Sequence, residues 1–203
     1  MILAYLYGKN SLKDKTGEKI LTDERLYERY FLGEKEAAEQ LVKRYGDSLI
    51  RYISGYISDY HESEDLMIEA FAQMFAKKRP VTESHCFKAY LYKTSRNLAL
   101  RHNKRKRFPL LELHQTGFEM SGVMSADADL LRKEQNRQLF QALEQVKKEY
   151  REVLYLLYFE EMKYEEAGRV MGKSVPQITN LAHRAKKSIK KILEREGFTY
   201  AHQ

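Results

Sequence analysis

The stretch that decides the fold runs from residue 150 to residue 187 and reads YREVLYLLYFEEMKYEEAGRVMGKSVPQITNLAHRAKK. Its first part, residues 150–159, is mostly apolar or aromatic, which predicts a buried helix. A short helix starting at Tyr164 follows, and Gly172 is expected to end it because glycine readily takes the left-handed conformation of a helix C-terminus. Ser174 can then cap a third helix that has Pro176 in its first turn.

The third helix of this stretch is expected to be amphipathic. An inner stripe recurs at helical spacing and consists of Ile178, Leu181, Ala185, Ile189 and Leu193. Two helices joined by a short turn that contains glycine form a helix-turn-helix, whose second helix fits the major groove of DNA. The pattern therefore predicts DNA binding. An ordinary helical hairpin with a solvated basic face is the alternative that the residues alone leave open.

The polar side chains of that third helix are the candidate DNA contacts. Asn and Gln can bind adenine, Arg and Lys can bind guanine, and Thr can touch the methyl group of thymine. The candidates are Gln177, Thr179, Asn180, His183, Arg184 and Lys187.

A second candidate nucleic-acid contact is a basic helix end. A helix is predicted from about Phe87 to Arg105, with an apolar stripe of Phe87, Tyr90, Leu91, Thr94 and Leu98. It ends in the run RHNKRKR, residues 101–107, which suits phosphate contact, and Tyr90 and Tyr92 suit stacking on bases. A solvated charge run that complements the negative end of the helix dipole explains the same residues equally well.

Composition favours helices throughout. Hydrophobic residues make up 43% of the 203 residues, and there are only 3 Pro and 10 Gly, which is unlike a chain of short strands and tight turns. We expect an all-α protein with two small helical domains. The expected parts are an N-terminal extension (1–21), a first domain (22–107), a flexible linker without Lys or Arg (108–131), a second domain (132–195) and a C-terminal tail (196–203).

The first domain shows several further helical stripes. Thr22 is expected to cap a helix that ends at Gly33. The next stripe contains Ala38, Leu41, Val42 and Tyr45, and its period continues through Leu49, Ile53, Tyr56 and Tyr60. Ser63 is expected to open another helix, which Pro80 closes and whose inner stripe is Leu66, Ala70, Phe71, Met74 and Phe75.

Charge and cysteine content indicate the kind of partner and the cellular compartment. A formal net charge of +7 favours polyanionic partners. Cys86 is the only cysteine, so no intrachain disulfide can form, which fits a reducing compartment. The chain shows no secretory leader and no apolar run long enough to insert in a membrane. We therefore expect a cytoplasmic protein.

Catalytic and metal-binding signatures are missing from the sequence. Glu62, Glu64, Asp65 and Glu69 could hold a metal or do acid–base chemistry, but helix capping and a solvated face explain them more simply. The six His residues lack zinc-site spacing, and neither a nucleophile elbow nor a phosphate-binding P-loop occurs. We expect no enzyme, no metal and no cofactor.

Four segments, in their order along the chain, resemble the extracytoplasmic-function (ECF) branch of the sigma-70 family of RNA polymerase sigma factors. Asp23 to Tyr45, with Arg51 and Tyr52, resembles the opening of region two. ESEDLMIEAF (62–71) resembles the segment that docks on the polymerase, and FKAYLYKTSRNLAL (87–100) resembles the promoter-reading helix. Residues 150–187 resemble region four, so that the resemblance covers about residues 22–107 and 132–195.

The resemblance implies a protein that binds core RNA polymerase and directs promoter-specific initiation by binding, without catalysis. Region two would dock on the clamp helices of the largest subunit through Asp65, Leu66, Ile68, Glu69 and Gln73. It would hold the downstream promoter element through Lys93, Arg96, Asn97, Arg101, Lys104 and Arg105. The loop from Pro80 to Cys86, together with Asn97, would hold an extruded base. Region four would meet the flap of the second-largest subunit and read the upstream promoter element through the six residues of the third helix. An anti-sigma factor is a plausible further partner.

The sequence departs from the family pattern at four positions. Ile68 stands where Gln is frequent, Tyr90 where Trp is common, and Gln177 where Thr is common. Gly168 stands where Ala is usual, and we expect it to weaken its helix by about 1 kcal/mol. Two other functions compete with the sigma-factor interpretation: a helix-turn-helix regulator that needs no polymerase, and a nucleic-acid enzyme that uses the 62–69 carboxylates.

Overall fold

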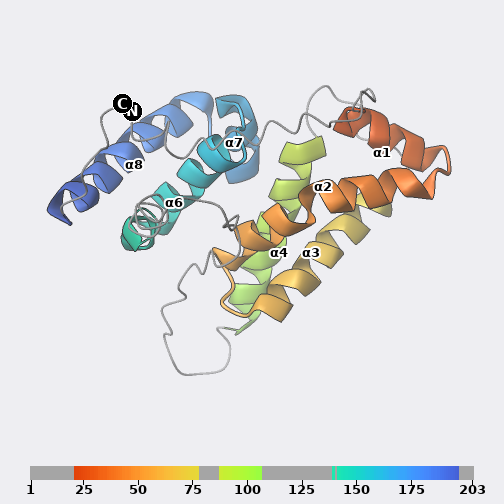
Figure 1. The fold of residues 1–203 in the computed structure, drawn as a ribbon, viewed down its shortest axis with the longest axis horizontal. Coiled ribbons are helices and arrows are strands. Elements are labelled where there is room, and N and C mark those ends of the chain that lie inside the picture. The colour runs from red at the N-terminus through yellow and green to blue at the C-terminus, as the bar shows by residue number, and fades with distance from the viewer. Residues whose placement is uncertain (1–20, 78–86, 107–138, 140, 197–203) are drawn as a thin grey trace, which may run out of the picture. The chain divides into compact units, whose positions relative to one another are not determined.

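The computed structural model describes residues 21–77, 87–106, 139 and 141–196 (Figure 1). Within these ranges every regular element is helical, which confirms the all-α prediction. The elements are α1 (Asp23–Phe31), α2 (Lys35–Ser54), α3 (Tyr60–Phe75), α4 (Phe87–Lys106), α6 (Lys148–Leu154), the π-helix η2 (Tyr155–Phe159), α7 (Tyr164–Met171) and α8 (Val175–Arg195).

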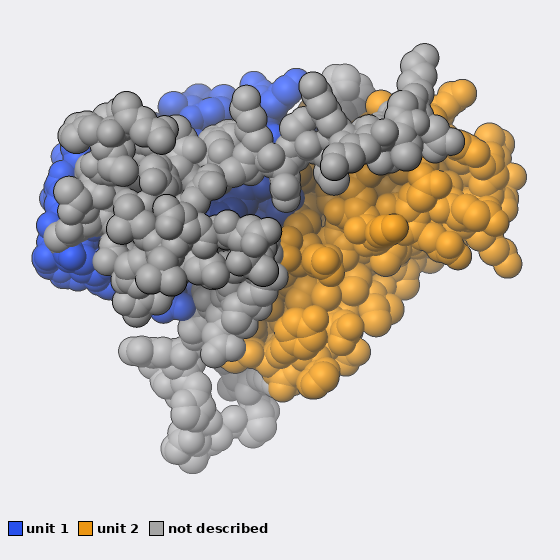
Figure 2. Space-filling model, viewed as in Figure 1, with its two compact units in different colours: residues 1–8, 117–168, 173–203 blue, residues 9–116, 169–172 orange. Residues whose placement is uncertain are grey.

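The helices fall into two compact units, which Figure 2 colours separately. Helices α1 to α4 build what we call the first unit (orange, unit 2 in the key of Figure 2), and α6, η2 and α8 belong to the second (blue, unit 1 in the key). Helix α7 is divided, because residues 169–172 are grouped with the first unit. The expected linker (108–131) and most of the expected extension and tail lie outside the described residues, so those boundaries stay predictions.

Aromatic side chains form a cluster in the core of the first unit. Helix α2 packs against α1, α3 and α4, and α3 packs against α4. The ring of Tyr27 lies 5.0 Å from the rings of both Phe31 and Phe87, and its buried hydroxyl donates a 2.6 Å hydrogen bond to the Met74 carbonyl oxygen. Large aromatic rings bury more apolar area per residue than aliphatic side chains do, so a small bundle gains stability from them.

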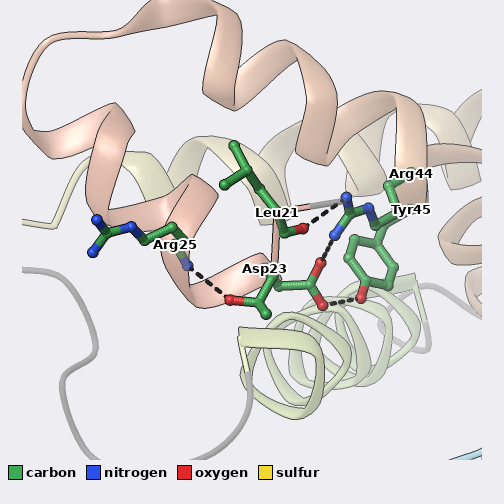
Figure 3. Close-up of polar contacts among 6 residues, drawn as sticks. Leu21, Asp23, Arg25, Arg44 and Tyr45 are labelled. Atoms are coloured by element: carbon green, nitrogen blue, oxygen red, sulfur yellow. Dashed lines mark hydrogen bonds and ion pairs between the residues drawn. The ribbon is translucent and has the colours of Figure 1, made fainter. Parts of the chain in front are cut away.

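Polar contacts attach the start of α1 to α2 (Figure 3). Thr22 caps α1 as predicted, since its hydroxyl oxygen accepts a hydrogen bond from the Arg25 amide. The Asp23 carboxylate accepts hydrogen bonds from the Arg44 guanidinium and the Tyr45 hydroxyl, both on α2. Arg44 also donates to the Leu21 carbonyl oxygen at 3.1 Å. These contacts fix how the first helix enters the bundle.

Two details of the predicted helices in this unit are wrong. In α2, Ala37 is buried in place of Ala38, and Val42 is exposed. Helix α3 starts at Tyr60, because the Asp59 carboxylate caps it by accepting from the Glu62 amide at 3.0 Å. Ser63, the predicted cap, is buried inside the helix, where its hydroxyl donates back to the Asp59 carbonyl oxygen. That internal bond satisfies a serine hydroxyl that burial would otherwise leave unpaired.

The predicted inner stripe of α4 also needs correction. Tyr92 is fully buried, and its hydroxyl lies 2.9 Å from the Ser48 hydroxyl, whereas Tyr90 is 36% exposed. Thr94 is half-buried, and Ser95 takes the buried position beside it. Helix α4 contacts α1, α2 and α3, so its buried surface is wider than a single stripe. A buried Tyr92 cannot stack on a base, which leaves Tyr90 for that role.

The second unit is built on the predicted buried helix. Helix α6 begins at Lys148 and continues directly into η2, so the helical path over residues 150–159 is confirmed, but its last five residues form a π-helix. Val153, Leu154 and Leu156 are buried, and α6 packs against α8. Within η2 the rings of Tyr155 and Phe159 stack with centroids 5.4 Å apart. π-Helical turns are rare and often occur near functional surfaces.

The helix-turn-helix forms as predicted, and the predicted residues end α7 and cap α8. Gly172 has a φ of 66°, and Ser174 caps α8 in a capping box. The inner stripe of α8 is Ile178, Ala182, Ala185, Ile189 and Leu193, so Ala182 replaces the predicted Leu181, which is half-buried.

Gly168 is required where it stands. A Cβ atom on residue 168 would lie 2.6 Å from the Lys173 carbonyl oxygen and 3.7 Å from a side-chain carbon of Ile178. The turn between α7 and α8 therefore approaches the backbone of α7 too closely for a side chain. The expected cost of glycine to the helix stays a prediction, and the structure adds that this glycine permits close packing of the turn.

Candidate polymerase and DNA interfaces

Helix α4 exposes a row of cations. Lys93, Asn97 and Arg101 are exposed and recur at intervals of four, which places them along one side of the helix. Lys104 and Arg105 extend the exposed row. Arg96, also a predicted contact, is half-buried and already interacts within the chain. Of the predicted downstream contacts, the structure therefore brings five into one exposed basic row.

Two residues inside the basic run point inward and anchor it. The Asn103 side-chain amide donates a 2.9 Å hydrogen bond to the Tyr56 carbonyl oxygen after α2. The His102 Nε2 atom lies 3.2 Å from a carboxylate oxygen of Glu62 on α3. Their neighbours Arg101 and Lys104 stay exposed. The sequence analysis did not predict that these two residues face inward. A signal was present, because His102 and Asn103 are the members of the run that are neither Lys nor Arg.

Helix α3 exposes an acidic face with one large apolar side chain. Asp65, Glu69 and Gln73 are exposed, and the Gln73 amide donates to a Glu69 carboxylate oxygen at 3.0 Å. Ile68 is 57% exposed between them. Leu66 is only 7% exposed and belongs to the core, so it is withdrawn from the predicted docking residues.

The predicted upstream contacts are all exposed on α8. They are Gln177, Thr179, Asn180, His183, Arg184 and Lys187. At about 3.6 residues per turn, Asn180, Arg184 and Lys187 lie opposite the buried Ile178–Ala185–Ile189 stripe. This geometry makes them the most outward-facing of the set.

Two of those six side chains already serve the helix itself. The Gln177 side-chain oxygen accepts from the Ser174 amide at 2.8 Å, which completes the cap. The Thr179 hydroxyl donates to the Val175 carbonyl oxygen at 3.0 Å. A base contact by either residue would have to share or break these bonds, so Asn180 and Arg184 are better placed to read sequence.

Several other cations of the second unit are engaged inside it. Lys173, in the turn, forms a 3.0 Å ion pair with Glu149, and the Lys186 ammonium lies 5.0 Å above the ring of Tyr158. Arg151 is half-buried and donates to the carbonyl oxygens of Leu143 and Glu144 at 2.9 and 2.7 Å. Burial lowers the pKa of the Arg151 guanidinium. These residues stabilise the unit and are separate from the outward face of α8.

Metal sites and membrane-spanning helices were sought among the described residues. Across the described residues, no three His, Cys, Asp or Glu side chains lie together as metal ligands would. Among the helices of those residues, none combines the length and apolar character that crossing a membrane needs.

Comparisons with known proteins agree with this geometry. The model for Sigma-70 region 2 matches residues 41–108, and the model for Sigma-70 region 4 matches residues 136–189. The RNA polymerase sigma-H factor of Pseudomonas aeruginosa is 26% identical over an alignment of 181 residues, and the match covers 85% of this chain and 94% of that protein. The ECF RNA polymerase sigma factor BldN of Streptomyces coelicolor is 28% identical over 170 residues, 83% of this chain and 64% of that protein.

The fold also matches a solved structure. The sigma factor RpoE of Bartonella quintana, solved in complex with the anti-sigma factor NepR, superimposes with a TM-score of 0.54 at 18% identity. The match covers 77% of this chain and 96% of that one, and at this identity it concerns the fold alone. The two family models together cover more than half of the chain. The chain therefore belongs to the ECF branch of the sigma-70 family of RNA polymerase sigma factors.

Proposed function

We propose that this sigma factor docks on core RNA polymerase through α3, holds the downstream promoter element along α4, and reads the upstream element with α8. One observation carries the proposal: α3 and α4 pack together and present unlike faces, one acidic with an exposed Ile68, the other basic. A basic face suits DNA phosphates, whereas an acidic and apolar face suits a protein partner. The inward contacts of His102 and Asn103 hold the basic row in place.

On α3 the proposed contact is with the clamp helices of the largest polymerase subunit. Reversing Asp65 and Glu69 to Lys together should weaken core binding at least tenfold, because like charges then replace complementary ones across the interface. Both side chains are exposed, so the helix should stay intact. The matched control reverses Glu36 and Glu39, which are exposed on α2 and carry the same charge. Equal loss of core affinity in both variants would place the docking surface elsewhere.

On α4 the proposed contacts are to phosphates on the exposed row that includes Lys93, Arg101 and Lys104. Phosphate binding releases counterions, so DNA affinity should fall steeply with salt. If α4 and the recognition helix α8 together make about six phosphate contacts, affinity should fall roughly a thousandfold between 50 and 200 mM salt. A nearly flat salt dependence would rule out phosphate-led binding.

In the second unit we propose that Asn180, His183 and Arg184 read the upstream element while the unit contacts the flap of the second-largest subunit. Support comes from their exposure on the outward side of α8. An anti-sigma factor is a further proposed partner, since RpoE of Bartonella quintana was solved with one. The protein would act in the cytoplasm, where the polymerase and the promoters are.

The mechanism we propose consists of binding steps without a catalytic one. The decisive experiment is run-off transcription with purified core polymerase, this chain and a promoter library. The expected result is specific initiation that core alone cannot make. A chain that binds promoter DNA but never makes core initiate would instead be a regulator that needs no polymerase. Nuclease or other chemical change in the DNA without core would support an enzyme.

A further inference from the structure

Lys77 and Tyr90 form a contact that the functional assignments above do not use. The Lys77 Nζ atom lies 3.3 Å from the centroid of the Tyr90 ring. Lys77 directly follows the end of α3, and Tyr90 lies in the first turn of α4. The distance is well inside the range of about 6 Å for cation–π attraction. The lysine is half-buried, so its ammonium is held against the ring more firmly than a freely solvated side chain would be.

Tyr90 is the aromatic side chain that α4 presents to its surroundings. Phe87 and Tyr92, the other aromatic residues of this helix, are buried. Tyr90 precedes Lys93 by three residues and Asn97 by seven, so all three lie on the same side of the helix. An aromatic ring beside a row of cations is the arrangement with which proteins hold single-stranded nucleic acid.

We propose that Lys77 is a positioning residue: it holds the Tyr90 ring as a platform on which an unpaired base of the promoter stacks. The inference rests on the proposed function of α4. The ammonium covers one face of the ring, and on this proposal the base stacks on the other face of the partly exposed ring. A free tyrosine side chain loses rotational freedom when a base stacks on it, whereas a ring already held by Lys77 loses less. The stack itself would accept any base, because every base has a π-face.

The contact also explains how the ends of α3 and α4 are kept together. Helix α3 carries the proposed polymerase-docking residues, and α4 carries the proposed DNA contacts. The attraction between Lys77 and Tyr90 joins these two surfaces at the N-terminal end of α4. Cation–π attraction at a partly exposed site corresponds to a change of about two- to fivefold in an equilibrium. We expect an effect of that size on promoter opening.

The experiment uses the full chain with core polymerase and a promoter that carries 2-aminopurine in its downstream element. The 2-aminopurine replaces a base next to the one proposed to stack on Tyr90, so its fluorescence rises when the duplex opens and is not quenched by the ring, and core affinity is measured separately. Lys77→Met should lower the open fraction about two- to fivefold and leave core affinity unchanged. Lys77→Arg should restore opening, because a guanidinium also stacks on aromatic rings. Tyr90→Leu should lower opening roughly tenfold, since a stacked base is lost.

The double variant separates positioning from direct DNA contact. Lys77→Met should cause no further loss once Tyr90 is Leu, because the two residues act through one contact. A further loss of opening by about two- to fivefold in the double variant would show that Lys77 acts independently of Tyr90. A fall of about 1 in the salt slope of DNA binding for Lys77→Met would show that Lys77 contacts a phosphate directly. Either result overturns the inference.

Other outcomes distinguish this inference from the proposed function. If Tyr90→Leu impairs opening and Lys77→Met does not, the platform stands and the role of Lys77 is rejected. If wild-type protein gives no initiation with core, the proposed function fails first. Circular dichroism and a thermal melt check folding, and Tyr90→Phe, which keeps the ring, should retain opening if Tyr90→Leu is unstable.

Discussion

The two helices proposed to contact DNA, α4 and α8, are held in different ways. Helix α4 lies among α1, α2 and α3, and buried residues occur around much of its circumference. Helix α8 packs mainly on α6 through a single stripe. As a result α4 presents a narrow row of cations, whereas α8 presents a broad polar face.

The difference shows what each helix can do with DNA. Inward contacts from His102 and Asn103 hold the basic end of α4 against α2 and α3, which favours a fixed grip on phosphates. On α8, Asn180, Arg184 and Lys187 stand clear of the unit, which favours reading of base edges in a groove. Under the proposed function, α4 would position the DNA through phosphate contacts and α8 would specify its sequence through base contacts.

The largest expected effect comes from the two tyrosines of α4. Tyr92→Ala should destabilise the first unit by about 3–5 kcal/mol, because it leaves a cavity in the aromatic core. Tyr90→Ala is the matched control, and as a partly exposed residue it should cost less than about 1 kcal/mol. Urea unfolding monitored by circular dichroism measures both. Similar losses for the two variants would mean that α4 is not surrounded as described.

The helix-turn-helix depends on the close approach at Gly168. Gly168→Ala should destabilise the second unit by about 1–3 kcal/mol, since the new methyl group would meet the Lys173 carbonyl oxygen. Gly46→Ala on α2 is the control, because no atom lies within 4 Å of its added Cβ. That change should stabilise by about 0.5–1 kcal/mol. Thermal melts of both variants test the pair, and stabilisation by Gly168→Ala would show that the turn can relax.

On α8, the effects of losing a base contact and of losing a phosphate contact should be distinguishable. Asn180→Ala should change which upstream sequences support transcription and cost about 1–3 kcal/mol at one base position. Lys187→Ala should weaken all promoters about equally and lower the salt slope by about 1. Run-off transcription across a library of upstream elements distinguishes them. If Asn180→Ala lowers transcription from every promoter by the same factor, Asn180 does not contact a base.

The smallest expected effect concerns alkaline pH and the core beneath α4. Burial raises the pKa of Tyr27 to about 12 from its ordinary 10.0, so the folded state keeps a proton that the unfolded chain loses first. The resulting stability is complete below pH 10 and is lost as the pH rises through about 12. Between pH 9 and 11 wild type should lose about 1 kcal/mol more than Tyr27→Phe. Equal losses in urea unfolding at both pH values would contradict the shift.

Much of the second unit could be predicted from the sequence because its helices are packed on one side. The stripe of α8, the cap at Ser174 and the turn at Gly172 follow local rules of periodicity and backbone conformation. In α4 the same rules placed Tyr90 in the apolar stripe and did not identify Tyr92 as a buried residue. A helix with three neighbouring helices has no single apolar stripe, so periodicity alone cannot tell which of its faces are buried.

The sequence by itself determined the helical class, the order of the helices and the residue types that can meet DNA and polymerase. It did so because capping, helical period and charge are properties of short segments. Only the tertiary structure decided that His102 and Asn103 face inward, that Gly168 must lack a side chain and that Lys77 lies on Tyr90. Each of these depends on which neighbour the chain brings within a few ångströms, and that distance is fixed by packing between segments far apart in sequence.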